Sequence, residues 1–171
     1  MQMVKKIFLG ILLFGAAILL FMPKEEIYFK LERELAKKGV EINERRIEET
    51  PWSLTIEGVT IYVEGIPVAK IESLRFFSLL LFNRLEVKHT EINEGFGNKI
   101  PSPIEEVRAT YAVWMPTKTE LFVEGAFGKA VGDISLVERR LYLRIEEEKA
   151  IDSVRSLLKK GEKGLYYEIS F

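Results

Sequence analysis

The sequence contains no cysteine and only one histidine, His89. Without cysteine the chain can form no disulfide, thiolate nucleophile or cysteine-ligated metal site. A Ser-His-Asp triad would need His89 with Asp133 or Asp152, but no serine lies in a nucleophile-elbow context. No spacing of His89 and carboxylates predicts a metal site either. We therefore expect a protein that is not an enzyme and that has no cofactor and no metal.

Charge of either sign is not in excess, because 25 lysines and arginines face 26 acidic residues and the formal net charge is −1. No field of the whole molecule would attract nucleic acid, so we expect no nucleic-acid partner. Aspartate, asparagine and glutamine are scarce, whereas glutamate, lysine and arginine are abundant, a balance that is sometimes seen in thermophile proteins.

One long apolar run is present, at the start of the chain, where Lys5 and Lys6 precede an uncharged stretch from Ile7 to Met22. A membrane-spanning helix needs about 17–25 apolar residues. Positive charge before the run predicts a cytoplasmic N-terminus. We therefore expect residues 1–22 to anchor a single-pass protein in the inner membrane, with residues 23–171 forming one periplasmic domain. The anchor residues that we expect are Lys5, Lys6, Ile7, Phe8, Leu12, Phe14, Leu19 and Phe21.

A cleaved signal peptide is the alternative reading of the same run. A peptidase site needs small residues near the end of the apolar stretch, and the residues from Leu19 to Met22 are all bulky. Gly15, Ala16 and Ala17 are small, but cleavage there would leave bulky apolar residues at the new terminus. The pattern favours an uncleaved anchor, and cleavage stays open.

Two segments have the three- and four-residue spacing of amphipathic helices. The first runs over residues 24–38, with glutamates in its first turn and lysines in its last, which complements the helix dipole. Its mixed charges favour packing on a sheet, and a position on a membrane surface is the alternative. The second runs over residues 148–160. The apolar positions of the two helices are Ile27, Tyr28, Leu31 and Leu35, and Ile151, Val154, Leu157 and Leu158.

Between these helices the apolar residues alternate with a period of two, which is typical of strands. Gly58 lies where the alternation changes phase, as a β-bulge would require. The expected strands cover residues 53–64, 68–76, 85–92, 107–115, 121–126, 130–136, 140–145 and 165–171. This order predicts an α+β fold, in which an N-terminal transmembrane helix precedes a curved antiparallel β-sheet with flanking amphipathic helices.

Residues 69–92 resemble the AsmA-like repeat; their sequence is AKIESLRFFSLLLFNRLEVKHTEI. In that family, such a unit follows strands of the type LTIEGVTIYVEG. The end of the chain, from Ala130 to Phe171, is similar to the C-terminal portion of type II secretion system protein N. The resemblance implies a half-barrel sheet that guides lipid along a hydrophobic groove, or an accessory part of a secretion machine. It transfers no catalytic residue to this chain.

A cluster of apolar and aromatic residues is the candidate groove or partner surface, and filling of the core is the alternative. Its members are Phe76, Phe77, Leu79, Leu80, Leu81, Phe82, Trp52 and Trp114. We expect a non-enzymatic periplasmic component of a type II secretion-like machine that acts through protein contacts. The alternative is an AsmA-like lipid-binding or lipid-transfer module. The expected partners are membrane lipid and envelope or secretion-system proteins, and the sequence does not predict the oligomeric state.

Overall fold

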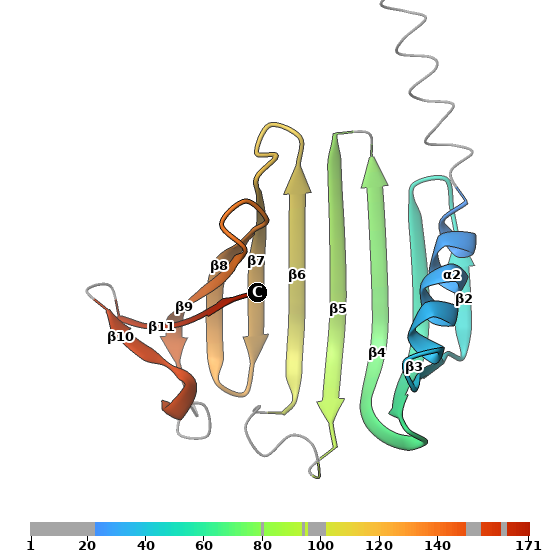
Figure 1. Cartoon of the computed structure of the whole chain (residues 1–171), viewed down its shortest axis with the longest axis horizontal. Helices are drawn as coiled ribbons and strands as arrows, with labels where there is room; N and C mark the ends of the chain where they lie inside the picture. Colours follow the sequence, from blue (N-terminus) through green and yellow to red (C-terminus); the bar gives the residue numbers. More distant parts are fainter. Residues whose placement is uncertain (1–22, 80, 94, 96–101, 150–154, 162–163) are drawn as a thin grey trace, which may run out of the picture.

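A single antiparallel sheet of eleven strands dominates the computed structural model, which describes residues 23–79, 81–93, 95, 102–149, 155–161 and 164–171 (Figure 1). The strands follow the order β1-β3-β4-β5-β6-β7-β8-β9-β11-β10, and β2 also pairs with β3. The elements are α2 (Lys24–Ala36), β1 (Val40–Asn43), β2 (Arg46–Glu49), β3 (Ser53–Val63), β4 (Ile66–Leu79), β5 (Phe82–Ile92), β6 (Ile104–Ala112), β7 (Lys118–Gly125), β8 (Gly128–Ser135), β9 (Arg140–Glu148), η1 (Arg155–Leu157), β10 (Lys159–Gly161) and β11 (Gly164–Ser170).

The predicted α+β fold with flanking helices is wrong, because the described chain is mostly antiparallel sheet with α2 as its one α-helix. Where the second amphipathic helix was expected, β9 continues to Glu148 and Arg155–Leu157 form only one 3₁₀ turn. The next residues form β10, which pairs with β11 through Lys159↔Tyr166. Pairing along the sheet therefore overrides the helical spacing of the apolar residues, and residues 150–154 lie outside the described part of the chain.

Within the described residues, no helix is long and apolar enough to span a membrane. The helix α2 has 13 residues, or about 20 Å at 1.5 Å per residue, against a hydrocarbon core of about 30 Å, and it is rich in charge. The prediction of a single-pass protein in the inner membrane with a periplasmic domain is corrected accordingly. The segment predicted as its anchor, residues 1–22, lies outside the described residues.

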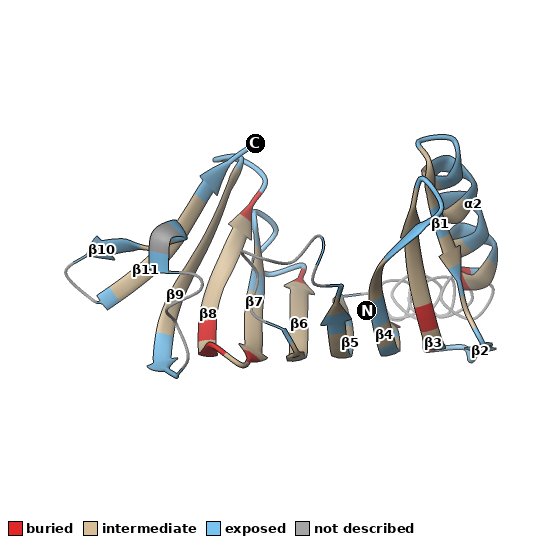
Figure 2. Ribbon diagram, turned by 90° about the horizontal axis from the view of Figure 1, so that it is seen from below, coloured by how far each residue is buried: buried red, intermediate tan, exposed pale blue. Residues whose placement is uncertain are grey.

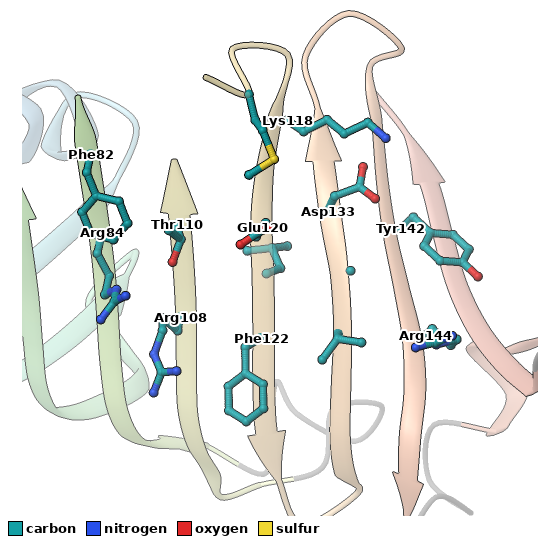
Figure 3. A pocket seen from close by; sticks show the side chains of 14 residues that line it. Phe82, Arg84, Arg108, Thr110, Lys118, Glu120, Phe122, Asp133, Tyr142 and Arg144 are labelled. Atoms are coloured by element: carbon teal, nitrogen blue, oxygen red, sulfur yellow. The ribbon is translucent and has the colours of Figure 1, made fainter. Parts of the chain in front are cut away.

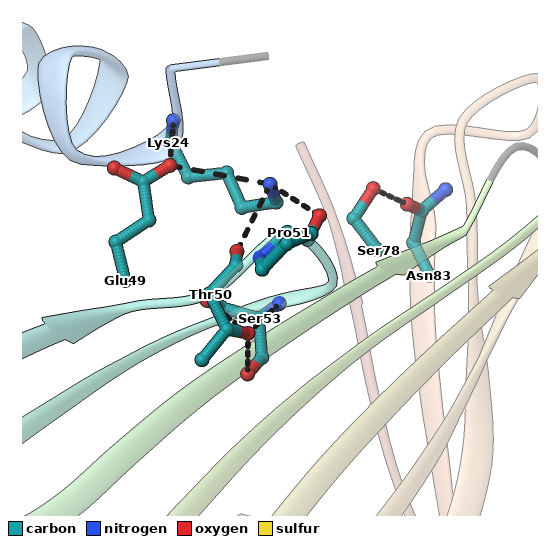
Figure 4. Close-up of polar contacts among 7 residues, drawn as sticks. All are labelled: Lys24, Glu49, Thr50, Pro51, Ser53, Ser78 and Asn83. Carbon is teal, nitrogen blue, oxygen red and sulfur yellow. Dashed lines mark hydrogen bonds and ion pairs between the residues drawn. The ribbon is translucent and has the colours of Figure 1, made fainter. Parts of the chain in front are cut away.

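The helix α2 covers one end of the sheet. Ile56 of β3 is fully buried, and Leu54 and Val59 are 4% exposed; Tyr28 of α2 packs against this cluster. Lys24, at the start of α2, donates from Nζ to the carbonyl oxygen of Pro51 at 2.8 Å (Figure 4). These contacts hold α2 on the β1–β3 end of the sheet. Tyr28 packs on the sheet as expected, whereas Ile27 and Leu31 are 50% and 56% exposed and do not.

Gly58 lies at a kink in β3. Its φ of +65° is in the left-handed region, and the ladder with β4 passes from Glu57↔Ser73 to Val59↔Ile71. Leu54 and Val59, on opposite sides of Gly58 in the sequence, nevertheless belong to one core cluster. The predicted change of phase at Gly58 is therefore confirmed, while the register shift itself lies between Ile61 and Tyr62.

The sheet is an open trough rather than a flat layer. Seen from below, the strands at its two ends, β8, β9 and β11 on one side and β1 and β3 on the other, rise to the same side of β5 and β6 (Figure 2). Right-handed twist and kinks such as that at Gly58 are the usual sources of such curvature.

Candidate functional site

One face of the sheet is apolar from β3 to β9. Side chains alternate between the two faces of a strand, so residues paired directly across neighbouring strands share a face. Two rows of such partners are apolar from β3 onward, although Glu49 of β2 lies opposite Leu54. The first row is Leu54, Phe76, Leu85, Ala109, Leu121, Gly132, Leu143 and Tyr167, and the second is Ile56, Leu74, Val87, Val107, Val123, Ala130 and Ile145. We call this surface the apolar face.

Only the two ends of the apolar face are covered in the described part of the chain. The helix α2 covers it over β1 and β3. At the other end Phe127, in the turn between β7 and β8, packs against Val123, Ala130 and other residues. Between these clusters the side chains are only partly buried, and Leu85 on β5 is 37% exposed. No described element therefore covers the middle of the apolar face.

The opposite face is charged, and its charges are paired both along and across strands. The Glu86 carboxylate lies 3.6 Å from the guanidinium of Arg84 and 3.8 Å from that of Arg108. Lys129 makes ion pairs with Glu124 at 3.8 Å and with Glu147 at 3.1 Å. Such ladders are the usual composition of a solvated sheet face, so the two faces of this sheet differ sharply in chemistry.

A cleft of about 790 Å³ lies on this charged face, over β5 to β9 (Figure 3). The guanidinium of Arg108 lies 5.4 Å from the centre of the Phe122 ring. Glu120 of β7 lies opposite Asp133 of β8 in the strand register. Among the described residues, no group of three or more His, Cys, Asp or Glu side chains is placed to hold a metal. The lining of the cleft combines arginines, carboxylates and aromatic rings rather than a nucleophile next to a base.

The structure distributes the predicted surface cluster over three places. Phe76 lies on the apolar face, whereas Phe77 and Phe82 lie on the charged face with their ring centroids 6.4 Å apart. Four others, Trp52, Leu79, Leu81 and Trp114, are exposed at one end of the sheet. Leu80 lies outside the described residues. A contiguous apolar segment in the sequence is thus divided, because successive residues of a strand point to opposite faces.

Sequence reasoning did not select the residues in the middle of the apolar face. They are Leu85, Val87, Val107, Ala109, Leu121, Val123 and Leu143. Each was recognisable as one member of an alternating strand, which is the only signal that the sequence contains. Which of them lie side by side depends on strand order and register, and these were not predicted.

His89 of β5 has a φ of +46°, in the left-handed region, as Gly58 of β3 does. Two glutamates lie beside its ring. Its Nδ1 lies 3.3 Å from Oε2 of Glu105, and its Nε2 lies 3.5 Å from Oε1 of Glu91. The hydrogen bond with Glu105, and secondarily that with Glu91, raises the pKa of the imidazole. Because the folded-state pKa is raised, the stabilisation from His89 is present below the ordinary histidine pKa and is lost as the pH rises through the raised value.

We expect Glu105→Gln to lower the pKa of His89 towards its ordinary value, because the variant removes the larger of the two favourable interactions with the imidazolium. His89 is the only histidine, so an NMR titration of its imidazole protons gives one unambiguous curve. The matched control is Glu120→Gln on β7, which leaves both neighbours of His89 in place. A pKa of His89 that is the same in the Glu105→Gln variant and in the wild type would contradict the geometry.

Comparison with protein-family models, with curated proteins and with solved structures gives no match for this chain. The resemblance to AsmA-like proteins and to protein N is neither supported nor refuted and stays a prediction. Neither the comparisons nor the fold supports assigning the chain to a type II secretion system or to protein transport, and we withdraw that classification along with that of a single-pass membrane protein.

Proposed function

We propose that the protein is a non-enzymatic binding module whose apolar face holds a long hydrocarbon chain, such as the acyl chain of a fatty acid. The observation that carries the proposal is the pair of apolar rows that cross the sheet from β3 to β9 while α2 covers only the end over β1 and β3. Soluble proteins seldom leave an apolar surface of this extent uncovered unless it binds something.

The chemistry of the apolar face favours a hydrocarbon chain over a shaped polar ligand. The open positions at its centre are aliphatic, as at Leu85, Val107 and Leu121, and a polar ligand would need convergent donors or acceptors to fix its orientation. Burying a methylene group is worth about 0.8 kcal/mol, so a chain with about twelve buried methylenes gains about 10 kcal/mol before the costs of association.

A charge in the middle of the apolar face tests the proposal. We expect Leu121→Glu to weaken binding of the fluorescent fatty acid cis-parinaric acid at least about tenfold, since a buried carboxylate beside a hydrocarbon chain is strongly unfavourable. The measurement is a fluorescence titration of the full chain, with circular dichroism to confirm that the variant retains its sheet.

The matched control is Val131→Glu, which places the same charge on the charged face, where Val131 is paired between Phe122 and Arg144. We expect its affinity for cis-parinaric acid to equal that of the wild type. The proposal fails if folded wild-type protein shows no saturable binding, or if the two variants lose affinity equally.

The resemblance to protein N is the basis for the other function expected from the sequence, an accessory role in a secretion-like machine through protein contacts. No contact, burial or charge arrangement of the described residues favours that role over binding of a hydrocarbon chain.

A further inference from the structure

Exposed apolar side chains gather at one end of the trough. The antiparallel ladders bring together at this end the starts of β3, β5, β7 and β9 and the ends of β4, β6, β8 and β11, as the pairs Leu79↔Phe82 and Lys118↔Ser135 show. The exposed residues here are Trp52, Leu79, Leu81, Val113, Trp114, Met115, Leu136, Val137, Ile169 and Phe171. We call this set the apolar rim.

Backbone hydrogen bonds join neighbouring segments of the apolar rim. The Ser78 amide donates to the Trp52 carbonyl at 2.8 Å, and the Val113 amide donates to the Leu81 carbonyl at 3.0 Å. At the far side the amide of Phe171 donates to the carbonyl of Arg139 at 2.9 Å. The rim is therefore held in place by the sheet rather than formed by loosely placed loops.

The rim side chains are among the most exposed apolar groups of the described chain. Trp114 is 67% exposed and Val137 is 73% exposed. At the opposite end of the strands the described residues expose fewer large apolar side chains: Ile66, beside the turn between β3 and β4, is 52% exposed, whereas Phe127 is buried against the sheet. The asymmetry between the two ends calls for a physical cause, since packing in the core does not need these rim side chains.

We propose that the apolar rim docks on a phospholipid surface, with its tryptophan and aliphatic tips in the interfacial layer. Tryptophan is enriched at such interfaces because its ring is apolar while its N–H needs a hydrogen-bonding partner. The tips are spread over separate loops, and the loops from Thr50 to Trp52 and from Val113 to Thr117 contain no charged residue. A row of separate tips suits a fluid surface, whereas a protein partner would favour one compact, shaped patch.

The place where the described chain begins points to the same occupant. Lys24 is tied to the loop of Thr50 and Pro51 by hydrogen bonds of 3.5 and 2.8 Å, so the chain enters the domain at the rim end. The residues that precede it in the sequence, Ile7 to Met22, carry no charge. The most apolar part of the sequence therefore joins the described chain next to the apolar rim.

The experiment uses the two tryptophans of the chain, Trp52 and Trp114, both of which lie on the rim. The full chain is mixed with phosphatidylcholine vesicles whose acyl chains are brominated or unbrominated. Since interfacial groups lie about 5–10 Å into the headgroup and acyl boundary, we expect brominated lipid to reduce the tryptophan emission about twofold. Trp52→Phe and Trp114→Phe assign the effect to single rings.

The matched control moves the reporter to the other end of the trough. In the variant with both tryptophans replaced by phenylalanine, Ile66→Trp places one ring at an exposed position beside the turn between β3 and β4. We expect no quenching of this ring by brominated lipid. Cosedimentation with the vesicles, measured in the same samples, shows whether the protein is bound.

Each other outcome overturns the proposal. Protein that sediments with the vesicles while Trp52 and Trp114 stay unquenched is bound through another part of the chain. Equal quenching at position 66 excludes docking by the rim. A blue shift that depends on protein concentration without vesicles assigns the rim to a second copy of the chain. None of these readouts depends on cis-parinaric acid, so this proposal and the binding of a hydrocarbon chain by the apolar face can fail separately.

Discussion

Replacing Gly132 by alanine is expected to lower the free energy of unfolding by at least about 3 kcal/mol. A Cβ at this position would lie 1.8 Å from the carbonyl oxygen of Tyr142 and 2.7 Å from its carbon, both in the backbone of β9. Backbone atoms in the middle of a sheet cannot rotate away as a side chain can. The strands β8 and β9 would have to separate by more than 1 Å, which breaks the ladder around Gly132↔Leu143.

Urea denaturation measures this effect, and Gly95→Ala is its control. An added Cβ at Gly95 meets nothing within 4 Å, and its φ is not in the left-handed region. We expect this control to change the free energy of unfolding by less than about 1 kcal/mol. Equal stability of the Gly132→Ala variant and the wild type would contradict the close approach of β8 to β9.

Ile56→Ala is expected to destabilise the protein by about 2–5 kcal/mol, because it leaves a cavity in the best-packed part of the molecule. Ile56 is fully buried and is paired between Ile47 of β2 and Leu74 of β4, and it belongs to the cluster against which Tyr28 of α2 packs. Loss of its side chain removes contacts on which the docking of α2 depends.

The control for this variant is Ile169→Ala near the end of β11, where the side chain is 47% exposed. The same change of residue there removes little buried surface, and we expect a loss below about 1 kcal/mol. The two variants are compared by urea denaturation. Comparable losses for Ile56→Ala and Ile169→Ala would show that the core under α2 is not the main centre of packing.

The apolar face and the apolar rim differ in what they would bind. Leu121 lies in the middle of the trough on β7, whereas Trp114 lies in the loop that precedes this strand. If both proposals hold, the trough opens beside the surface on which the rim docks, and a hydrocarbon chain could pass from that surface to the apolar face without crossing the charged face.

Local patterns predicted much of the sheet correctly. Alternation of apolar residues placed strands at Leu54–Ile56, at Leu85–Val87 and at Leu121–Val123, and the change of phase at Gly58 corresponds to its positive φ. These features depend on neighbours in the sequence, since a strand's period of two and the conformational freedom of glycine act within a few residues.

The second helix was predicted wrongly because Leu157 and Leu158 have helical spacing while the residues after them find backbone partners in β11. β11 begins three residues after β10 ends and also pairs with β9, so the sheet gives these residues backbone partners that the spacing of apolar residues alone does not reveal.

By itself, the sequence determined which residues alternate, where the chain turns, and that no cysteine chemistry is available. Only the tertiary structure decided that Leu85, Ala109 and Leu121 lie side by side, and that Trp52 and Trp114 share one end of the trough. The physical reason is register: the face to which a residue points is a local property, whereas its neighbours on that face depend on pairing between strands that lie far apart in the chain.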